Sequence, residues 1–118
     1  MTTDVEALLA DLRQFVAERD WSQFHDPKNL TMLLASEVGE LVAEYRWVAG
    51  DVADAHSRDA GAARERIIDE VGDVGIALLL LCDRTGIDLG DAIAAKLAKN
   101  RVRYPADTAR GKAERPEG

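Results

Sequence analysis

The chain has 118 residues, a hydrophobic fraction of 47% and a formal net charge of −7. This length predicts one domain with a real core, and the composition excludes a wholly disordered chain. The negative charge argues against a general nucleic-acid binder. We find no apolar run long enough to cross a membrane and no signal-peptide pattern at the N-terminus. The single cysteine, Cys82, cannot form a disulfide within the chain, so we expect a cytoplasmic protein.

Four long helices are predicted from helical spacing of apolar residues and from capping signals, at about 4–19, 28–48, 62–84 and 88–103. Residues 49–61 contain small residues and two glycines and predict a loop, with a short helical turn left open. Residues 106–118 are charged without an apolar period and predict a disordered tail. The expected fold is therefore an all-α four-helix bundle over residues 1–105.

The third predicted helix is apolar on more than one face. Its main stripe includes Val71, Val74 and Leu78, but Ile76 and Leu79 project from other sides. A helix that is apolar all round must be buried all round. Because four helices in one short chain can hardly bury it, we expect a homo-oligomer, either a dimer or a tetramer.

Two pairs of acids stand within these apolar helices, Glu37 with Glu40 and Glu70 with Asp73. Residues three apart are neighbours on one helix face. On a helical wheel these acids border the apolar stripe, whereas acids on a solvated face normally point away from it. Glu44 lies at the same edge, and its role stays open. Facing carboxylates repel one another, and a divalent cation with oxygen ligands is the simplest partner that offsets the repulsion.

Two kinds of metal site use carboxylates on helices. A di-iron bundle of the ferritin type requires Glu-x-x-His motifs, and neither His25 nor His56 has a glutamate three residues before it. Mg²⁺, or Mn²⁺, prefers carboxylate and water ligands and binds phosphates. The acid pairs therefore favour a magnesium site that acts on a phosphorylated substrate.

Two further groups of polar and aromatic residues have open interpretations. Trp21, Phe24 and His25 lie in the connection between the first two helices, where they either close the end of the bundle or contact a flat ligand. A polar strip follows the fourth helix at i, i+4 and i+7, and it is either a solvated face or a phosphate-binding surface: Lys96, Asn100 and Arg103.

The pattern resembles a known family. Glu37-x-x-Glu40, Glu70-x-x-Asp73, Lys96-x-x-x-Asn100 and Arg103-Tyr104-Pro105 together are similar to the all-α nucleoside triphosphate pyrophosphohydrolases of the MazG type. The segment from Glu18 to His25, which leads to Asn29, resembles more narrowly the dCTP pyrophosphatase branch. The resemblance covers about residues 12–105.

This resemblance implies Mg²⁺-dependent hydrolysis of a nucleoside triphosphate to the monophosphate and pyrophosphate. It implies that both acid pairs bind the metal and that one acid, Glu40, orients or deprotonates the attacking water. Lys96 would contact the triphosphate and stabilise the leaving pyrophosphate. The remaining substrate-binding residues implied by position are Asn100 and Arg103 at the phosphates, Trp21, His25 and Trp47 around the base, and Asn29 beside the pocket.

Two positions depart from the dCTP branch, since Ala77 stands where we expect a tyrosine and Leu12 where we expect a polar residue. We therefore expect hydrolysis of pyrimidine deoxynucleoside triphosphates, dCTP or modified forms among them. Phosphoribosyl-ATP as the only substrate would indicate a different relative. The alternative function is a non-catalytic helical interaction or regulatory module, which would tolerate Glu40→Gln and Asp73→Asn.

Overall fold

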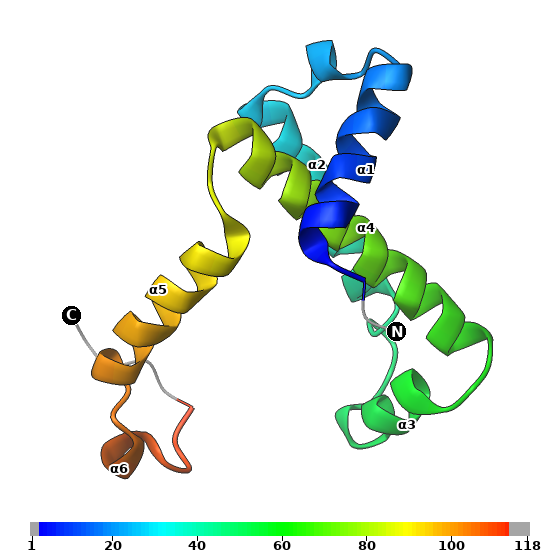
Figure 1. Cartoon of the computed structure of the whole chain (residues 1–118). Helices are drawn as coiled ribbons and strands as arrows, with labels where there is room; N and C mark the ends of the chain where they lie inside the picture. The colour runs from blue at the N-terminus through cyan, green and yellow to red at the C-terminus, as the bar shows by residue number, and fades with distance from the viewer. Residues whose placement is uncertain (1–2, 114–118) are drawn as a thin grey trace. The chain divides into compact units, whose positions relative to one another are not determined.

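The structure, a computed structural model, describes residues 3–113, and all regular structure within them is helical (Figure 1). The chain forms two compact units, one up to Gly86 and one from Ile87 onward, which are described separately. The elements in chain order are α1 (Val5–Glu18), η1 (Ser22–Phe24), α2 (Pro27–Ala43), η2 (Gly50–Val52), α3 (Ala53–Arg58), α4 (Ala62–Thr85), α5 (Leu89–Arg103) and α6 (Ala106–Ala109).

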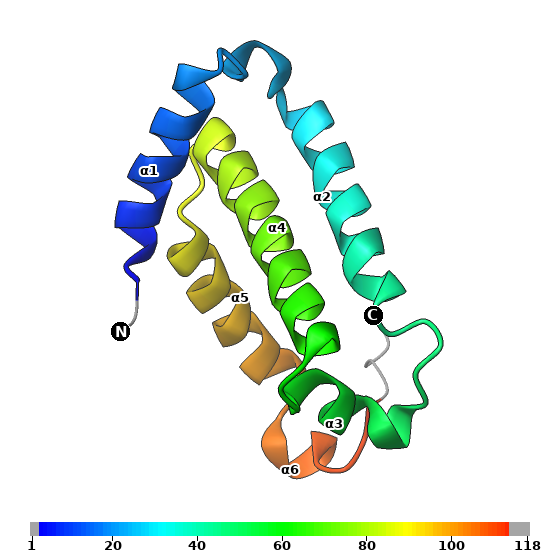
Figure 2. The same ribbon diagram turned by 90° about the vertical axis from the view of Figure 1, so that its right-hand side faces the viewer.

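The first unit is organised around α2 and α4, which run antiparallel and side by side (Figure 2). α1 packs on α4, and α3 packs beside the start of α4. Side-chain caps fix two of the helix starts, because the Asp4 carboxylate accepts from the Glu6 N–H and the Asp26 carboxylate accepts from the Asn29 N–H. α4 ends at Gly86, whose φ of 71° is the left-handed conformation that favours glycine.

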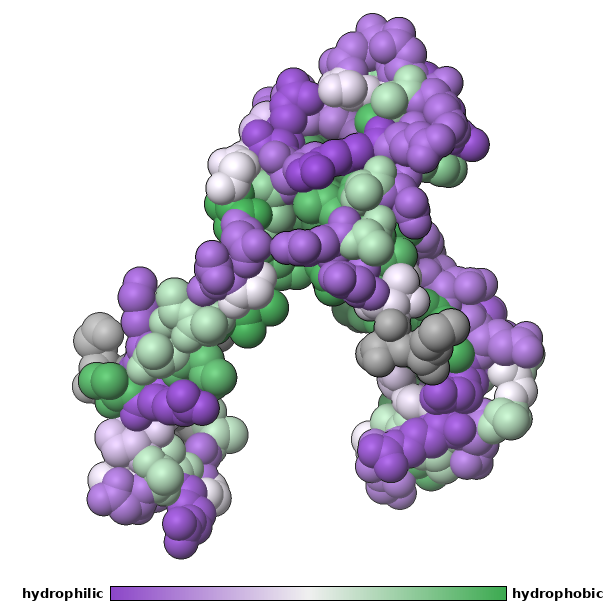
Figure 3. Space-filling model, viewed as in Figure 1, coloured by the Kyte–Doolittle hydropathy of each residue, from purple (hydrophilic) through white to green (hydrophobic). Residues whose placement is uncertain are grey.

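The core of the first unit lies where α1, α2 and α4 meet. Leu30 and Ala77 are each 1% exposed, and Val16 and Cys82 are also buried. Many other large apolar side chains remain open, and Figure 3 shows green, apolar side chains at the surface of each unit. Ile76 and Val71 of α4 are among these exposed residues, and the homo-oligomer expected to cover them stays a prediction.

The structure differs from the predicted elements in three places. α2 ends at Ala43, not Val48, because the Glu44 and Tyr45 N–H groups bond three residues back and tighten the chain into turns. The predicted loop contains a helix, α3, where only a turn was considered. Residues 106–109 form α6 inside the segment expected to be disordered, while residues 114–118 of that segment lie outside the described residues.

The second unit contains α5 and α6. Asp88 caps α5, since its carboxylate accepts from the Asp91 N–H at 2.8 Å. Ile93, Leu97 and Val102 of α5 are exposed. Over residues 3–113, none of the helices combines the length and apolarity needed to cross a bilayer.

Candidate functional site

The α2–α4 interface changes from apolar to charged along its length. Helical spacing places Glu37 and Glu40 of α2 in one row with Glu44, the C-cap residue that follows the helix. On α4, spacings of four and three residues place Arg66, Glu70 and Asp73 in another row. Because the helices are antiparallel, the acidic end of the α2 row faces the charged first half of α4.

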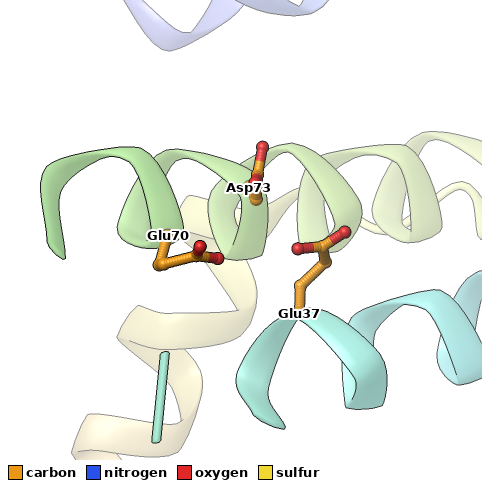
Figure 4. Close-up of side chains that lie close together, drawn as sticks. All are labelled: Glu37, Glu70 and Asp73. Carbon is orange, nitrogen blue, oxygen red and sulfur yellow. The ribbon is translucent and has the colours of Figure 1, made fainter. Parts of the chain in front are cut away.

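Three of these carboxylates form a cluster across the interface. Glu37, Glu70 and Asp73 each offer an oxygen, and these three oxygens lie within 4.8 Å of one another (Figure 4). The Glu70 Oε2 atom is buried and has no hydrogen-bond partner among the described residues. A buried carboxylate oxygen without a partner is costly, and a divalent cation is the partner that three convergent carboxylates suit. The cluster therefore fits a metal ion on its donor chemistry.

The electrostatics of the cluster agree with its geometry. The pKa of Glu70 is raised above its ordinary value of 4.5, first by burial and then by the negative charges of Asp73, Glu40, Glu37 and Glu44. Both effects penalise the ionised carboxylate. Glu40 is exposed and is not one of the three clustered residues. Its negative charge nevertheless contributes to the raised pKa of Glu70.

Beyond the three clustered carboxylates, the two rows end in an ion pair that was not predicted from the sequence. Arg66 Nε donates to Glu44 Oε1 at 3.0 Å across α2 and α4. Two spacings in the sequence place these residues beside the acids, since Glu44 follows Glu37 by seven residues and Arg66 precedes Glu70 by four. Glu44, whose role the sequence left open, thus belongs to the charged half of the interface.

Three predicted substrate residues lie around the start of α2. The Trp21 ring packs edge-on against Phe15, with ring centroids 5.7 Å apart. His25 is partly buried and lines a cavity of about 220 Å³ together with Leu30. The Asn29 side chain donates to the Phe24 carbonyl at 3.0 Å, which ties η1 to α2.

Trp47 lies beyond the other end of α2. It is 89% exposed and lines an open cavity of about 550 Å³ with residues of η2 and α3. Near it, Tyr45 contacts His56 edge-on and hydrogen-bonds to Ser57 at 2.6 Å, which ties α3 to the end of α2. At 1.5 Å per residue, α2 is roughly 25 Å long. Trp21 and Trp47 therefore lie beyond opposite ends of this helix, and their contact with a base stays a prediction.

The predicted phosphate-binding residues lie in the second unit, on α5. Lys96 and Arg103 are exposed, and Asn100 is partly buried, at the predicted i, i+4 and i+7 positions. The guanidinium of Arg103 lies 5.6 Å from the centre of the Tyr104 ring. Their contact with the triphosphate stays a prediction.

Ala77, one of the two departures from the dCTP branch, has a structural role. It lies in the α4 row, one turn after Asp73, and is 1% exposed. It is therefore a core residue at the boundary between the apolar and charged halves of the interface. Leu12, the other departure, is partly buried on α1.

The fold agrees with comparisons to known proteins. The MazG-like family model matches residues 31–115, and the chain belongs to this family. The matched segment includes both acid pairs, Trp47 and the α5 strip.

The chain is similar to proteins named dCTP pyrophosphatase 1. It is 39% identical to the one from Mus musculus over 112 residues, which cover 92% of this chain and 65% of the relative. It is 42% identical to the one from Homo sapiens, covering 89% of this chain and 64% of the relative. The chain thus spans slightly less than two thirds of the length of these curated relatives.

The fold is also that of a solved pyrophosphatase from Archaeoglobus fulgidus. The two superpose with a TM-score of 0.78 at 34% sequence identity, over 89% of this chain and 95% of the archaeal one. This match confirms the predicted all-α class.

Proposed function

We propose that this protein hydrolyses nucleoside triphosphates to the monophosphate and pyrophosphate, with Mg²⁺ as its cofactor and Mn²⁺ as a possible substitute. The preferred substrates are pyrimidine deoxynucleoside triphosphates, dCTP or modified forms. The observation that supports this most is the Glu37, Glu70 and Asp73 cluster with its unpartnered Glu70 oxygen. Membership of the MazG-like family and similarity to dCTP pyrophosphatases support the reaction type.

The reaction joins a water oxygen to the α-phosphorus and breaks the bond between that phosphorus and the oxygen bridging to the β-phosphorus. Pyrophosphate leaves with the electron pair of the broken bond. A divalent cation, when bound, neutralises triphosphate charge and acidifies water. Glu37, Glu70 and Asp73 would hold that cation. Exposed Glu40 is on the same face and would orient the water and accept its proton.

The leaving pyrophosphate is an anion, and the protein itself has a net charge of −7. Cationic side chains are therefore needed close to the phosphates. Lys96 would stabilise the pyrophosphate, and Asn100 and Arg103 would hydrogen-bond to the phosphates. All three side chains follow one face of α5.

We also propose that the working form is a homo-oligomer, a dimer or a tetramer. Trp21 with His25 and the exposed Trp47 lie at opposite ends of α2, so a base pocket that uses all of them needs residues from two copies. The open apolar side chains of α4 and α5 are surfaces that such an assembly would cover. We further propose a cytoplasmic location, which the free, buried thiol of Cys82 supports because thiols stay reduced there.

The test is a panel of nucleotides assayed for pyrophosphate release with Mg²⁺, with Asp73→Asn as the inactive control. We expect the fastest turnover with a pyrimidine deoxynucleoside triphosphate and loss of turnover in the variant. No turnover of any nucleotide by the wild type would contradict the enzyme proposal and favour the non-catalytic module. Turnover of phosphoribosyl-ATP alone would contradict the proposed substrate class.

A further inference from the structure

The ion pair between Arg66 and Glu44 places a cation at the end of a row of acids. Arg66 lies one helical turn before Glu70 on α4, and Glu44, the residue that follows α2, lies seven residues after Glu37. Their 3.0 Å hydrogen bond crosses the same interface that holds the three clustered carboxylates. Arg66 is thus the basic residue adjoining the candidate metal site within the first unit.

The two partners of the pair differ in their exposure and in their remaining hydrogen-bonding capacity. The Glu44 side chain is 18% exposed, whereas that of Arg66 is 56% exposed. Only Nε of Arg66 donates to Glu44, and within residues 3–113 its two Nη groups donate to no protein atom. A guanidinium has five N–H donors in a planar fork, and four of them belong to the Nη groups. Glu44 fixes the inner edge of the fork and leaves the outer donors accessible.

We propose that Arg66 binds the pyrophosphate portion of the substrate through its Nη groups, and that Glu44 is the residue that positions it. This inference rests on the proposed function. A triphosphate bound through a cation at Glu37, Glu70 and Asp73 extends beyond the acids, and Arg66 lies one turn away along the same row. Planar guanidinium groups suit phosphate oxygens because two parallel N–H bonds can form.

A purely structural role for the pair predicts a different result. Exposed ion pairs contribute little to stability because solvent screens the charges and holding both side chains costs entropy. If Arg66 only joined α2 to α4, its replacement would shift thermal stability slightly and leave phosphate affinity unchanged. Affinity for pyrophosphate therefore separates the two roles.

The experiment measures binding of inorganic pyrophosphate with Mg²⁺ by calorimetry, together with KM and kcat on the preferred nucleotide. Arg66→Met is compared with Arg64→Met. The control removes the same charge from α4, but Arg64 lies on another helical face, where it donates to the Ser57 carbonyl at 3.1 Å. We expect Arg66→Met to weaken pyrophosphate binding and raise KM by about tenfold or more, with the control close to wild type.

Two substitutions at Glu44 test the positioning role. Glu44→Gln keeps an oxygen that can accept from Arg66 Nε and removes a negative charge, so pyrophosphate should bind as tightly as in the wild type or more tightly. Glu44→Ala releases Arg66 and should weaken binding, although less than Arg66→Met does. Equal pyrophosphate affinities in the two Glu44 variants would overturn the positioning role.

The outcomes separate this inference from the proposed function. Pyrophosphate affinity that is equal in Arg66→Met and Arg64→Met, or undetectable in the wild type, would overturn the role of Arg66. Wild-type protein that binds pyrophosphate through Arg66 but hydrolyses no nucleotide would uphold the binding site and contradict the enzyme. Thermal melts of each variant show whether it is folded, and Arg66→Lys, which keeps the charge without the fork, should bind with intermediate affinity.

Discussion

The two halves of the α2–α4 interface serve opposite purposes. In one half, Leu30 and Ala77 are almost completely buried and apolar. In the other half, Glu37, Glu70 and Asp73 converge and leave the Glu70 Oε2 atom without a partner. The apolar half stabilises the pairing of the two helices, and the charged half uses that pairing to hold carboxylates close together. The contrast indicates that holding these carboxylates close together lowers the stability of the fold.

The largest expected effect separates activity from stability in the charged half. Asp73→Asn should lower pyrophosphate release by about a hundredfold or more, since a metal ion supplies several kcal/mol of transition-state stabilisation. Without metal, the same change should leave the melting temperature unchanged or raise it, because repulsion with Glu70 is relieved. Glu65→Gln, an exposed acid in the first turn of α4, is the control and should change neither. A melting temperature that falls with the activity would show that Asp73 stabilises the fold.

In the apolar half, Leu30→Ala should destabilise the fold by about 2–5 kcal/mol, because it removes a fully buried side chain and leaves a cavity. Leu30 is 1% exposed, so almost all of its side-chain packing is lost in the variant. Met32→Ala, at an exposed position of the same helix, is the control. Chemical denaturation measures the free energy of unfolding of both variants. Equal decreases would contradict the assignment of Leu30 to the core of the apolar half.

The raised pKa of Glu70 predicts how stability changes with pH in the metal-free protein. When the folded-state pKa of an acid exceeds its unfolded value, the native state binds more protons, so stability falls as pH rises from 4.5 through the raised pKa. Glu70→Gln should remove this part of the pH dependence. Denaturation midpoints of both proteins from pH 4 to 7 provide the test, and parallel curves would show that Glu70 is ionised freely in the native state.

The smallest expected effect lies at the edge of the apolar half, where Arg13 and Asp83 pair across α1 and α4. The hydrogen bond from Arg13 holds the pKa of Asp83 below its ordinary value of 3.8. The pair therefore stabilises the fold above pH 3.8, and this contribution is lost as pH falls through the lowered pKa. Because Arg13 is largely exposed, Asp83→Asn should lower the melting temperature only slightly at neutral pH. A large drop in melting temperature would contradict the view that this pair behaves as an exposed ion pair.

Much of the first unit was predictable from residue spacing. Apolar periodicity and capping signals locate both ends of α1, the start of α2 and the end of α4 closely, because these signals depend on the local chain. The position of the two acid pairs at the edge of the apolar stripe predicted that all four carboxylates would meet. The structure brings three of them together, and Glu40 lies outside the cluster. Periodicity failed at the end of α2, where the apolar pattern continues but the hydrogen bonds tighten into turns.

The remaining features depend on pairing between elements. A wheel gives the angle of Glu44 but does not show that Arg66 faces it, because this requires the register of α4 against α2. The wheel also hides the distance along the helix that separates Trp21 from Trp47. α3 has too few residues for a clear apolar period, so its sequence alone suggested a loop.

The most direct test of the central claim is titration of the metal-free protein with Mg²⁺, followed by calorimetry and thermal melting. We predict saturable binding and a rise in melting temperature in the wild type, because the cation gives the Glu70 oxygen a partner and offsets the repulsion among the acids. Glu70→Gln should lose most of both effects, while Glu65→Gln should retain them. Equal binding and equal stabilisation in all three proteins would contradict a metal site at Glu37, Glu70 and Asp73.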